Sequence, residues 1–286
     1  MLKIITTVSV YCFLTLACCA KSIGIIQVIE HPALDSTRKG IIETLSKKYP
    51  DLKITWQSAQ GNMATAVQIA QTFVGKEVDC VVALGTTPAQ AAVNVCKDQN
   101  IPVIYTSVTD PKSAGLVDTA AGITNFVDVT RQIEAMLKFV PNLKTLGIIY
   151  NPGEANSEQL LKLTQDECTK RNIQLKTAVA LKVTDVRAAA QKLIGSVDAI
   201  FVNNDNTALA GFSSIAKVAN EVNLPLFASD ADLIKQGAWA VLGPDQYEIG
   251  VQTAEFVSSI LDKKLTINDL GIGYPRSVNL YKKDNI

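Results

Sequence analysis

Short apolar runs alternate with amphipathic segments along most of the chain. The runs at 22–28 and 78–84 are each followed, at 34–48 and 88–97, by apolar residues at helical spacing. Strands that alternate with helices, without hairpin turns between them, predict parallel sheets built from right-handed crossovers. The same pattern predicts further strands at 52–56, 103–105, 122–126, 238–242 and 277–281, and helices at 63–73 and 247–261.

The pattern occurs twice. Ile101 in the last repeated motif of the first half follows Ile23 in the first motif by 78 residues, and Leu224 follows Leu146 by the same 78. The sequence therefore predicts an α/β fold with two similar, doubly wound parallel-sheet lobes. Three pairs of similar motifs, one of each pair from each half of the chain, carry the repeat: IGII at 23–26 and LGII at 146–149, VDCVV at 78–82 and VDAIF at 197–201, and NIPVI at 100–104 and NLPLF at 223–227.

No Pro-, Gly- or Ser-rich linker separates the halves, so we expect strands to cross directly between the lobes. Lobes joined by several crossings can hinge like a clamshell around a ligand cleft. The crossings are expected near 122–126, 243–246 and 272–275. They divide the chain into a signal peptide (1–20), lobe 1 (21–124 plus 244–273) and lobe 2 (125–243 plus 274–286).

The first twenty residues have the pattern of an export signal. Lys3 precedes an apolar run at 4–17, which is too short for a comfortable membrane span, and small residues lead to a cleavage site after Ala20. Lipidation at Cys18 or Cys19 is the alternative, but neither follows the usual Leu-small-small pattern in good register. We therefore expect an exported, periplasmic protein.

Three cysteines remain after cleavage: Cys80, Cys96 and Cys168. An odd number leaves at least one free thiol. Cys80 lies in an apolar run and Cys96 on the apolar stripe of the next helix, which favours buried thiols over a disulfide between them.

Composition excludes several functions. The 286 residues are 48% hydrophobic and carry 27 basic and 27 acidic side chains, which gives no electrostatic footprint for nucleic acid. A single histidine and no metal-ligand spacing argue against a metal site. The glycine-rich nucleotide-binding motifs and the Gly-x-Ser-x-Gly elbow are absent, so no cofactor is expected. His31 beside Glu30 could form half of a catalytic pair, but no nucleophile is associated with it.

Candidate binding residues follow the predicted strands, because ligands of parallel sheets bind beyond the carboxyl ends of strands. These loops contain hydroxyls, amides and carboxylates and hardly a Lys or Arg. Caps and turns explain each loop alone equally well, whereas convergence on one cleft favours binding. The candidates are Glu30, His31, Thr86, Thr87, Ser107, Thr109, Asp110, Asn156, Asp205, Asn206, Asp230 and Asp245.

The first-lobe loops suit a carboxylate. Thr86 and Thr87 stand just before Pro88 at the start of a predicted helix, and either threonine can cap that helix. The free N–H groups of the first helical turn, together with the hydroxyls of Ser107 and Thr109, can hold an anion.

Second-lobe acidic residues suit an ammonium group. Asp205 and Asp230 each follow a strand, although either could simply cap a helix. Asp110 is a third candidate, but Pro111 after it indicates a turn.

Six motifs, spread in order over the mature chain, resemble the substrate-binding family of ABC transporters associated with tryptophan and tyrosine uptake. The resemblance implies a type I periplasmic-binding-protein fold that closes on a small ligand, with an amino acid expected and aromatic ones favoured. It also implies delivery to a membrane permease, and we expect a monomer. The motifs are IGIIQVIEHPALD at 23–35, AQGN at 59–62, VTDP at 108–111, YNPGEANS at 150–157, DNT at 205–207 and FASD at 227–230.

Three alternatives remain open. Another small polar solute such as a sugar is one, although sugar clefts usually offer Arg and stacking aromatics, and these loops contain no Arg and few aromatics. A sensory receptor domain is the second, and an exported α/β enzyme is the third and least favoured.

Overall fold

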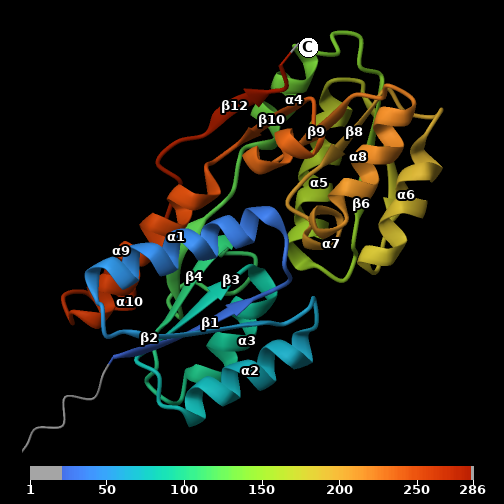
Figure 1. Ribbon diagram of the computed structural model, residues 1–286. Coiled ribbons are helices and arrows are strands. Elements are labelled where there is room, and N and C mark those ends of the chain that lie inside the picture. Colours follow the sequence, from blue (N-terminus) through green and yellow to red (C-terminus); the bar gives the residue numbers. More distant parts are fainter. Residues whose placement is uncertain (1–20, 285–286) are drawn as a thin grey trace, which may run out of the picture.

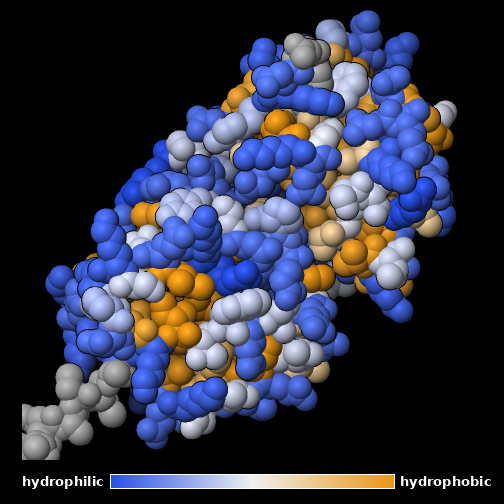
Figure 2. Space-filling model, in the orientation of Figure 1, coloured by the Kyte–Doolittle hydropathy of each residue, from blue (hydrophilic) through white to orange (hydrophobic). Residues whose placement is uncertain are grey.

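The computed structural model describes residues 21–284, so the predicted export signal and the alternative lipid anchor lie outside the described residues. Two six-stranded sheets with helices on both faces form two lobes, which confirms the predicted fold class (Figure 1). Within this range, no helix combines the length and apolar character that crossing a membrane requires. Figure 2 shows hydrophilic residues over much of the visible face, with apolar patches on both lobes.

The sheet of the first lobe is entirely parallel, in the order β11-β5-β4-β3-β1-β2. Successive side chains point to opposite faces, so Ile25 packs towards α1 and α9 whereas Ile26 packs towards α2 and α3. The elements are β1 (Ser22–Gln27), α1 (Pro32–Lys48), β2 (Lys53–Ser58), α2 (Met63–Gly75), β3 (Cys80–Leu84), α3 (Thr86–Cys96), β4 (Val103–Val108), β5 (Ala121–Thr124), α9 (Gln246–Leu261), α10 (Ile267–Leu270) and β11 (Ile272–Gly273).

The second sheet has the order β12-β10-β9-β8-β6-β7. Helices α4 and α5 pack on one face, and α6, α7 and α8 on the other. The elements are α4 (Val129–Leu137), β6 (Thr145–Tyr150), α5 (Ala155–Lys170), β7 (Gln174–Val179), η1 (Val183–Asp185), α6 (Val186–Leu193), β8 (Ala199–Val202), α7 (Asn206–Ala210), α8 (Phe212–Glu221), β9 (Leu226–Ala228), η2 (Ala231–Gln236), β10 (Ala240–Gly243) and β12 (Asn279–Lys282).

The two sheets have the same topology, as the repeated sequence motifs predicted. The order β5-β4-β3-β1-β2 corresponds to β10-β9-β8-β6-β7. The chain passes between the lobes after β5, after β10 and after β11. Strand β12 is antiparallel to β10, whereas the pattern predicted parallel pairing only. The reason is that β12 arrives directly from the other lobe, enters at the carboxyl end of β10, and must run away from that end.

Helices α1 and α9 approach closely because glycines face each other at their contact. A Cβ at Gly250 would lie 2.1 Å from the carbonyl oxygen of Thr37, and one at Gly40 would lie 2.3 Å from that of Tyr247. Only glycine fits at these two positions, and the close approach brings Thr37 beside Gln246, the first residue of α9.

Cys80, Cys96 and Cys168 are buried free thiols, so the alternative disulfide between Cys80 and Cys96 is not formed. Burial raises the pKa of Cys96 and of Cys168 to about 11, which keeps both protonated at neutral pH.

Candidate functional site

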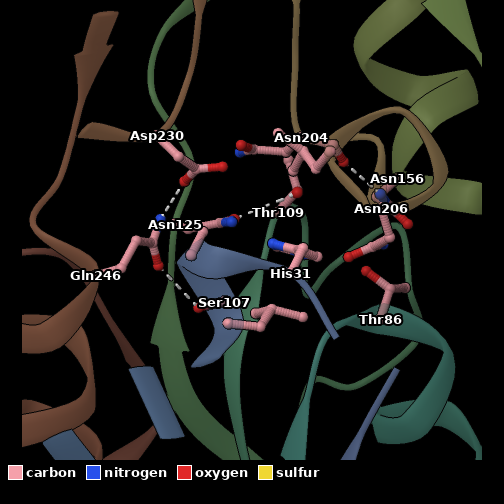
Figure 3. A pocket seen from close by; sticks show the side chains of 13 residues that line it. His31, Thr86, Ser107, Thr109, Asn125, Asn156, Asn204, Asn206, Asp230 and Gln246 are labelled. Atoms are coloured by element: carbon pink, nitrogen blue, oxygen red, sulfur yellow. Dashed lines mark hydrogen bonds between the residues drawn. The ribbon is translucent and has the colours of Figure 1, made fainter. Parts of the chain in front are cut away.

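A small polar cavity lies between the lobes, where loops after strands of both sheets meet (Figure 3). The cavity has a volume of only about 10 Å³, roughly enough for one water molecule. The lobes are therefore closed on each other here. The lining residues are His31, Ala33, Leu34, Thr86, Ser107, Thr109, Asn125, Asn156, Asn204, Asn206, Leu209, Asp230 and Gln246.

Most of the candidate residues converge on this cavity. Seven of the twelve line it: His31, Thr86, Ser107, Thr109, Asn156, Asn206 and Asp230. The structure places the other five outside the lining: Glu30, Thr87, Asp110, Asp205 and Asp245.

Asp205 points back into its own lobe. One carboxylate oxygen accepts from the backbone N–H of Ala208 at 2.7 Å and so caps α7. The other accepts from the Ser157 hydroxyl at 2.5 Å and the Asn151 N–H at 2.6 Å. Burial and the nearby Glu154 raise the pKa of Asp205 to about 7. Its hydrogen bonds organise the loops behind the cavity.

Three further carboxylates outside the lining accept hydrogen bonds from nearby protein groups. Glu30 accepts from the Ser58 hydroxyl at 2.7 Å, and Asp245 caps α9 through the N–H of Glu248 at 3.1 Å. Asp110 accepts from the hydroxyl and N–H of Ser113, the turn that Pro111 indicated. Thr87 lies in the first turn of α3, whose neighbour Thr86 reaches the cavity.

Helix α3 begins at Thr86, two residues before the predicted start, and its N-cap is Gly85 rather than a threonine. Gly85 has a φ of 95°, a left-handed conformation that favours glycine, and a Cβ there would lie 2.9 Å from Val28 Cγ1. This turn brings the Thr86 side chain and the first helical N–H groups to the edge of the cavity.

Ser107 is directed into the cavity by an irregularity in β4. Its φ is 53°, and the register between β4 and β5 shifts between Thr106 and Val108. Such bulges turn a side chain away from the regular alternation of a strand and concentrate at functional sites. The Ser107 hydroxyl consequently reaches Gln246 Oε1, to which it donates at 3.3 Å.

Gln246 links the two lobes inside the cavity, and the sequence analysis missed it. Its Nε2 donates to Asp230 of the second lobe, and its Oε1 accepts from the Ser107 hydroxyl at 3.3 Å (Figure 3). The same Oε1 accepts from the Thr37 hydroxyl at 3.1 Å. The side chain is 2% exposed. Its position in a predicted crossing was the available signal. Also missed were Ala33, Leu34, Asn125, Asn204 and Leu209.

Asp230 is the acidic residue that faces the cavity. It is 1% exposed, and one of its oxygens accepts from Gln246 while the other points into the open space (Figure 3). Burial raises its pKa to about 7, because the ionised form loses hydration. A cation placed against the second oxygen would replace that hydration.

Several buried polar atoms around the cavity have no hydrogen-bond partner within the protein. They include His31 Nε2, Asn156 Oδ1 and Asn204 Oδ1. Burial also lowers the pKa of His31 to about 4, so the imidazole is neutral at pH 7. Buried polar atoms are nearly always hydrogen-bonded, so this arrangement favours a ligand with several polar groups. Among residues 21–284, no three His, Cys, Asp or Glu side chains are grouped to hold a metal ion.

Comparison with known proteins identifies the family. The model of the ABC transporter substrate-binding protein family matches residues 22–269. The chain belongs to this family. A tyrosine-binding protein from Clostridioides difficile (strain R20291) is 34% identical to this substrate-binding protein over 263 residues, covering 88% of this chain and 75% of the relative. The resemblance stated from the motifs is thus confirmed.

Solved structures agree with the family and the type I fold. A Streptococcus pneumoniae ABC domain in complex with L-Trp superposes with a TM-score of 0.83 at 25% identity, covering 90% of this chain and 91% of that one. A ligand-free, open substrate-binding protein from Clostridium difficile gives 0.67 at 30% identity, covering 93% and 92%. A Bacillus halodurans protein with bound myo-inositol shares the fold at 18% identity (TM-score 0.72, covering 93% and 96%).

Proposed function

We propose that this substrate-binding protein captures an amino acid, with aromatic ones favoured, and delivers it to the permease of an ABC importer. The observation that carries the proposal is the buried Asp230, whose second oxygen faces a cavity otherwise lined by uncharged side chains. A single anionic group in such a cavity suits an ammonium group. The tyrosine-binding relative and the L-Trp complex give independent support for an amino acid.

The two lobes would hold different ends of the ligand. Asp230 takes the amine, while Thr86 and the first turn of α3 take the carboxylate. The hydroxyls of Ser107 and Thr109 join them by turning from Gln246 and Asn125 towards the ligand. Neutral His31 contributes a hydrogen bond from the first lobe. No Lys or Arg lines this cavity, so hydroxyls and N–H groups provide the anion binding.

The proposal includes the cellular setting. Residues 1–20 direct export to the periplasm, where the protein acts as a monomer without catalytic activity. The lobes comprise 21–124 plus 244–273 and 125–243 plus 274–286, and they close around the ligand. The matching strand orders of the two sheets support this division.

A thermal-shift screen of purified residues 21–286 against the amino acids and common sugars tests the proposed function. A ligand at 100 times its dissociation constant adds about 2.7 kcal/mol to the free energy of unfolding. Stabilisation by one or a few amino acids is the expected result. Stabilisation by sugars alone, or by nothing in the panel, would contradict the proposal.

A further inference from the structure

The side-chain amide of Gln246 makes the two kinds of contact that an amino acid would make in this cleft. Its Nε2 donates to the carboxylate of Asp230, the group proposed for the ligand amine. Its Oε1 accepts at 3.3 Å from the hydroxyl of Ser107, one of the groups proposed for the ligand carboxylate. An amide carries both donors and an acceptor, so this one side chain satisfies both partners at once.

The second hydroxyl proposed for the carboxylate is also occupied by an amide of the protein. The Thr109 hydroxyl donates to Asn125 Oδ1 at 3.3 Å. Both Ser107 and Thr109 therefore already have an amide oxygen as their acceptor, and a ligand carboxylate must replace these oxygens.

The closed arrangement leaves no room for an amino acid beside the Gln246 amide. The cavity volume of about 10 Å³ matches one water molecule, and even glycine is several times larger. Gln246 lines this cavity and is 2% exposed. An amino acid can therefore enter only if the lobes separate and the Gln246 amide gives up its contacts.

Gln246 is held so that separation of the lobes breaks its contact with Asp230. It is the first residue of α9, at the end of the crossing that follows β10. The close approach of α1 and α9 keeps it in the first lobe, where its Oε1 lies 3.1 Å from the Thr37 hydroxyl. Asp230 belongs to the second lobe. Once the lobes part, rotation about the side-chain bonds moves the amide without any change in the helix.

We propose that Gln246 determines the affinity by competing with the ligand, because its amide occupies the groups that an amino acid must use. This inference rests on the proposed function and names a residue that regulates the same site. Binding requires a protein molecule in which the Gln246 contacts are broken. The measured dissociation constant is then the intrinsic one divided by the fraction of such molecules. Loss of the amide should therefore tighten binding, whereas loss of a residue that contacts the ligand would weaken it.

Gln246→Ala tests the inference. Calorimetric titration gives the dissociation constants, and surface plasmon resonance the rate constants, for L-tyrosine, L-tryptophan and any other amino acid that the thermal-shift screen identifies. We expect the variant to bind about 3- to 30-fold more tightly than wild type, by the same factor for each ligand, because the cost belongs to the free protein. The gain should lie in the association rate, with the dissociation rate unchanged.

Thr253→Val is the matched control, because it removes a buried hydrogen-bonding group from the same helix outside the cavity lining. The Thr253 hydroxyl contacts Thr106 and the Ile249 carbonyl within the first lobe, both at 2.8 Å. This variant should retain the wild-type dissociation constants.

Gln246→Asn guards against misfolding of the alanine variant. It keeps the amide but is one methylene shorter, so it cannot reach Asp230 and the hydroxyls of Thr37 and Ser107 together. It should tighten binding in the same direction as Gln246→Ala.

The outcomes distinguish this inference from the proposed function. Unchanged or weaker binding by Gln246→Ala and Gln246→Asn, or a gain confined to the dissociation rate, would overturn the competing role and leave amino-acid binding in place. Equal tightening by Thr253→Val would also overturn it, because the effect would then come from general loosening of α9. Failure of every amino acid to bind the wild type and both Gln246 variants would overturn the proposed function and the inference together.

Discussion

The side-chain amide of Gln246 donates a hydrogen bond to the carboxylate of Asp230 and so joins the first lobe to the second inside the cleft. Hydroxyls of Thr37 and Ser107 fix the amide from the first-lobe side. The bond occupies one Asp230 oxygen and leaves the other facing the cavity. The residue proposed to bind the ligand amine therefore also contacts the opposite lobe.

The affinity for an amino acid should fall as the pH falls. The pKa of Asp230 is raised to about 7, and only the ionised carboxylate pairs strongly with an ammonium group. Below pH 7 the ligand must first displace a proton, which weakens binding by up to about tenfold per pH unit. Titration calorimetry in two buffers of different ionisation enthalpy measures the protons released when the amino acid binds. At pH 6 about one proton should be released per bound ligand, and at pH 8 almost none. Identical proton release at both pH values would count against this role of Asp230.

Asp230 should also make the ligand-free protein less stable at higher pH. Its pKa rises from 3.8 in the unfolded chain to about 7 in the folded one, so the folded state retains a proton that the unfolded state releases between these values. The contribution of Asp230 to stability is therefore complete below pH 4 and is lost as the pH rises through 7. Asp230→Asn removes this pH-dependent loss of stability because Asn does not titrate. The Asn side chain can still accept the hydrogen bond from Gln246.

Denaturant unfolding of wild type and Asp230→Asn at pH 5 and pH 8 measures the effect. The variant should gain about 2–3 kcal/mol of stability relative to wild type between pH 5 and pH 8, because the two states differ in protonation only up to about pH 7 in this range. Asp205 has a raised pKa as well, but it is present in both proteins and its contribution cancels in the difference. An unchanged difference between pH 5 and pH 8 would contradict the assignment.

Gln246→Leu should shift the ligand-free protein towards an open arrangement. The variant lacks both the donor to Asp230 and the acceptor for Thr37 and Ser107, so the link between the lobes is lost. Small-angle scattering should show a larger radius of gyration than for wild type, and saturating ligand should restore the compact form in both. Wild-type dimensions in ligand-free Gln246→Leu would mean that this link does not hold the lobes together.

Gly250→Ala should destabilise the first lobe. Its Cβ would lie 2.1 Å from the Thr37 carbonyl oxygen, so α1 and α9 would have to separate. Overpacking of this kind costs about 1–3 kcal/mol of unfolding free energy. Gly75→Ala is the control, because a Cβ there meets nothing within 4 Å. Equal free energies of unfolding for the two variants would show that the close approach of α1 and α9 is unimportant.

The fold could be predicted because its signals are local. Alternation of apolar runs and helical stripes depends only on neighbouring residues, and the repeated motifs at 23–26 and 146–149 marked both first strands. The direction of β12 could not be read this way, since it depends on where the chain re-enters the second lobe.

The site was less predictable because tertiary contacts decide which side chains reach it. Asp205 and Asp230 both follow strands, yet the hydroxyl of Ser157, 48 positions away, holds Asp205 outside the cavity lining. In the sequence, Gln246 resembles any polar residue at the start of a helix. Its hydrogen bond with Thr37 joins residues 209 positions apart. No local pattern contains either contact.

The central claim is that Asp230 binds the amine of an amino acid, and one thermodynamic cycle tests it directly. Calorimetry measures the identified amino acid and its analogue without the amine against wild type and Asp230→Asn, with Asp205→Asn as the control variant. Loss of one partner of a desolvated charge pair costs about 2–5 kcal/mol, so Asp230→Asn should weaken the amino acid by about 30-fold or more. Removal of the amine should weaken binding to wild type and to Asp205→Asn, but should change little in Asp230→Asn. An equal effect of amine removal in wild type and Asp230→Asn would contradict the account.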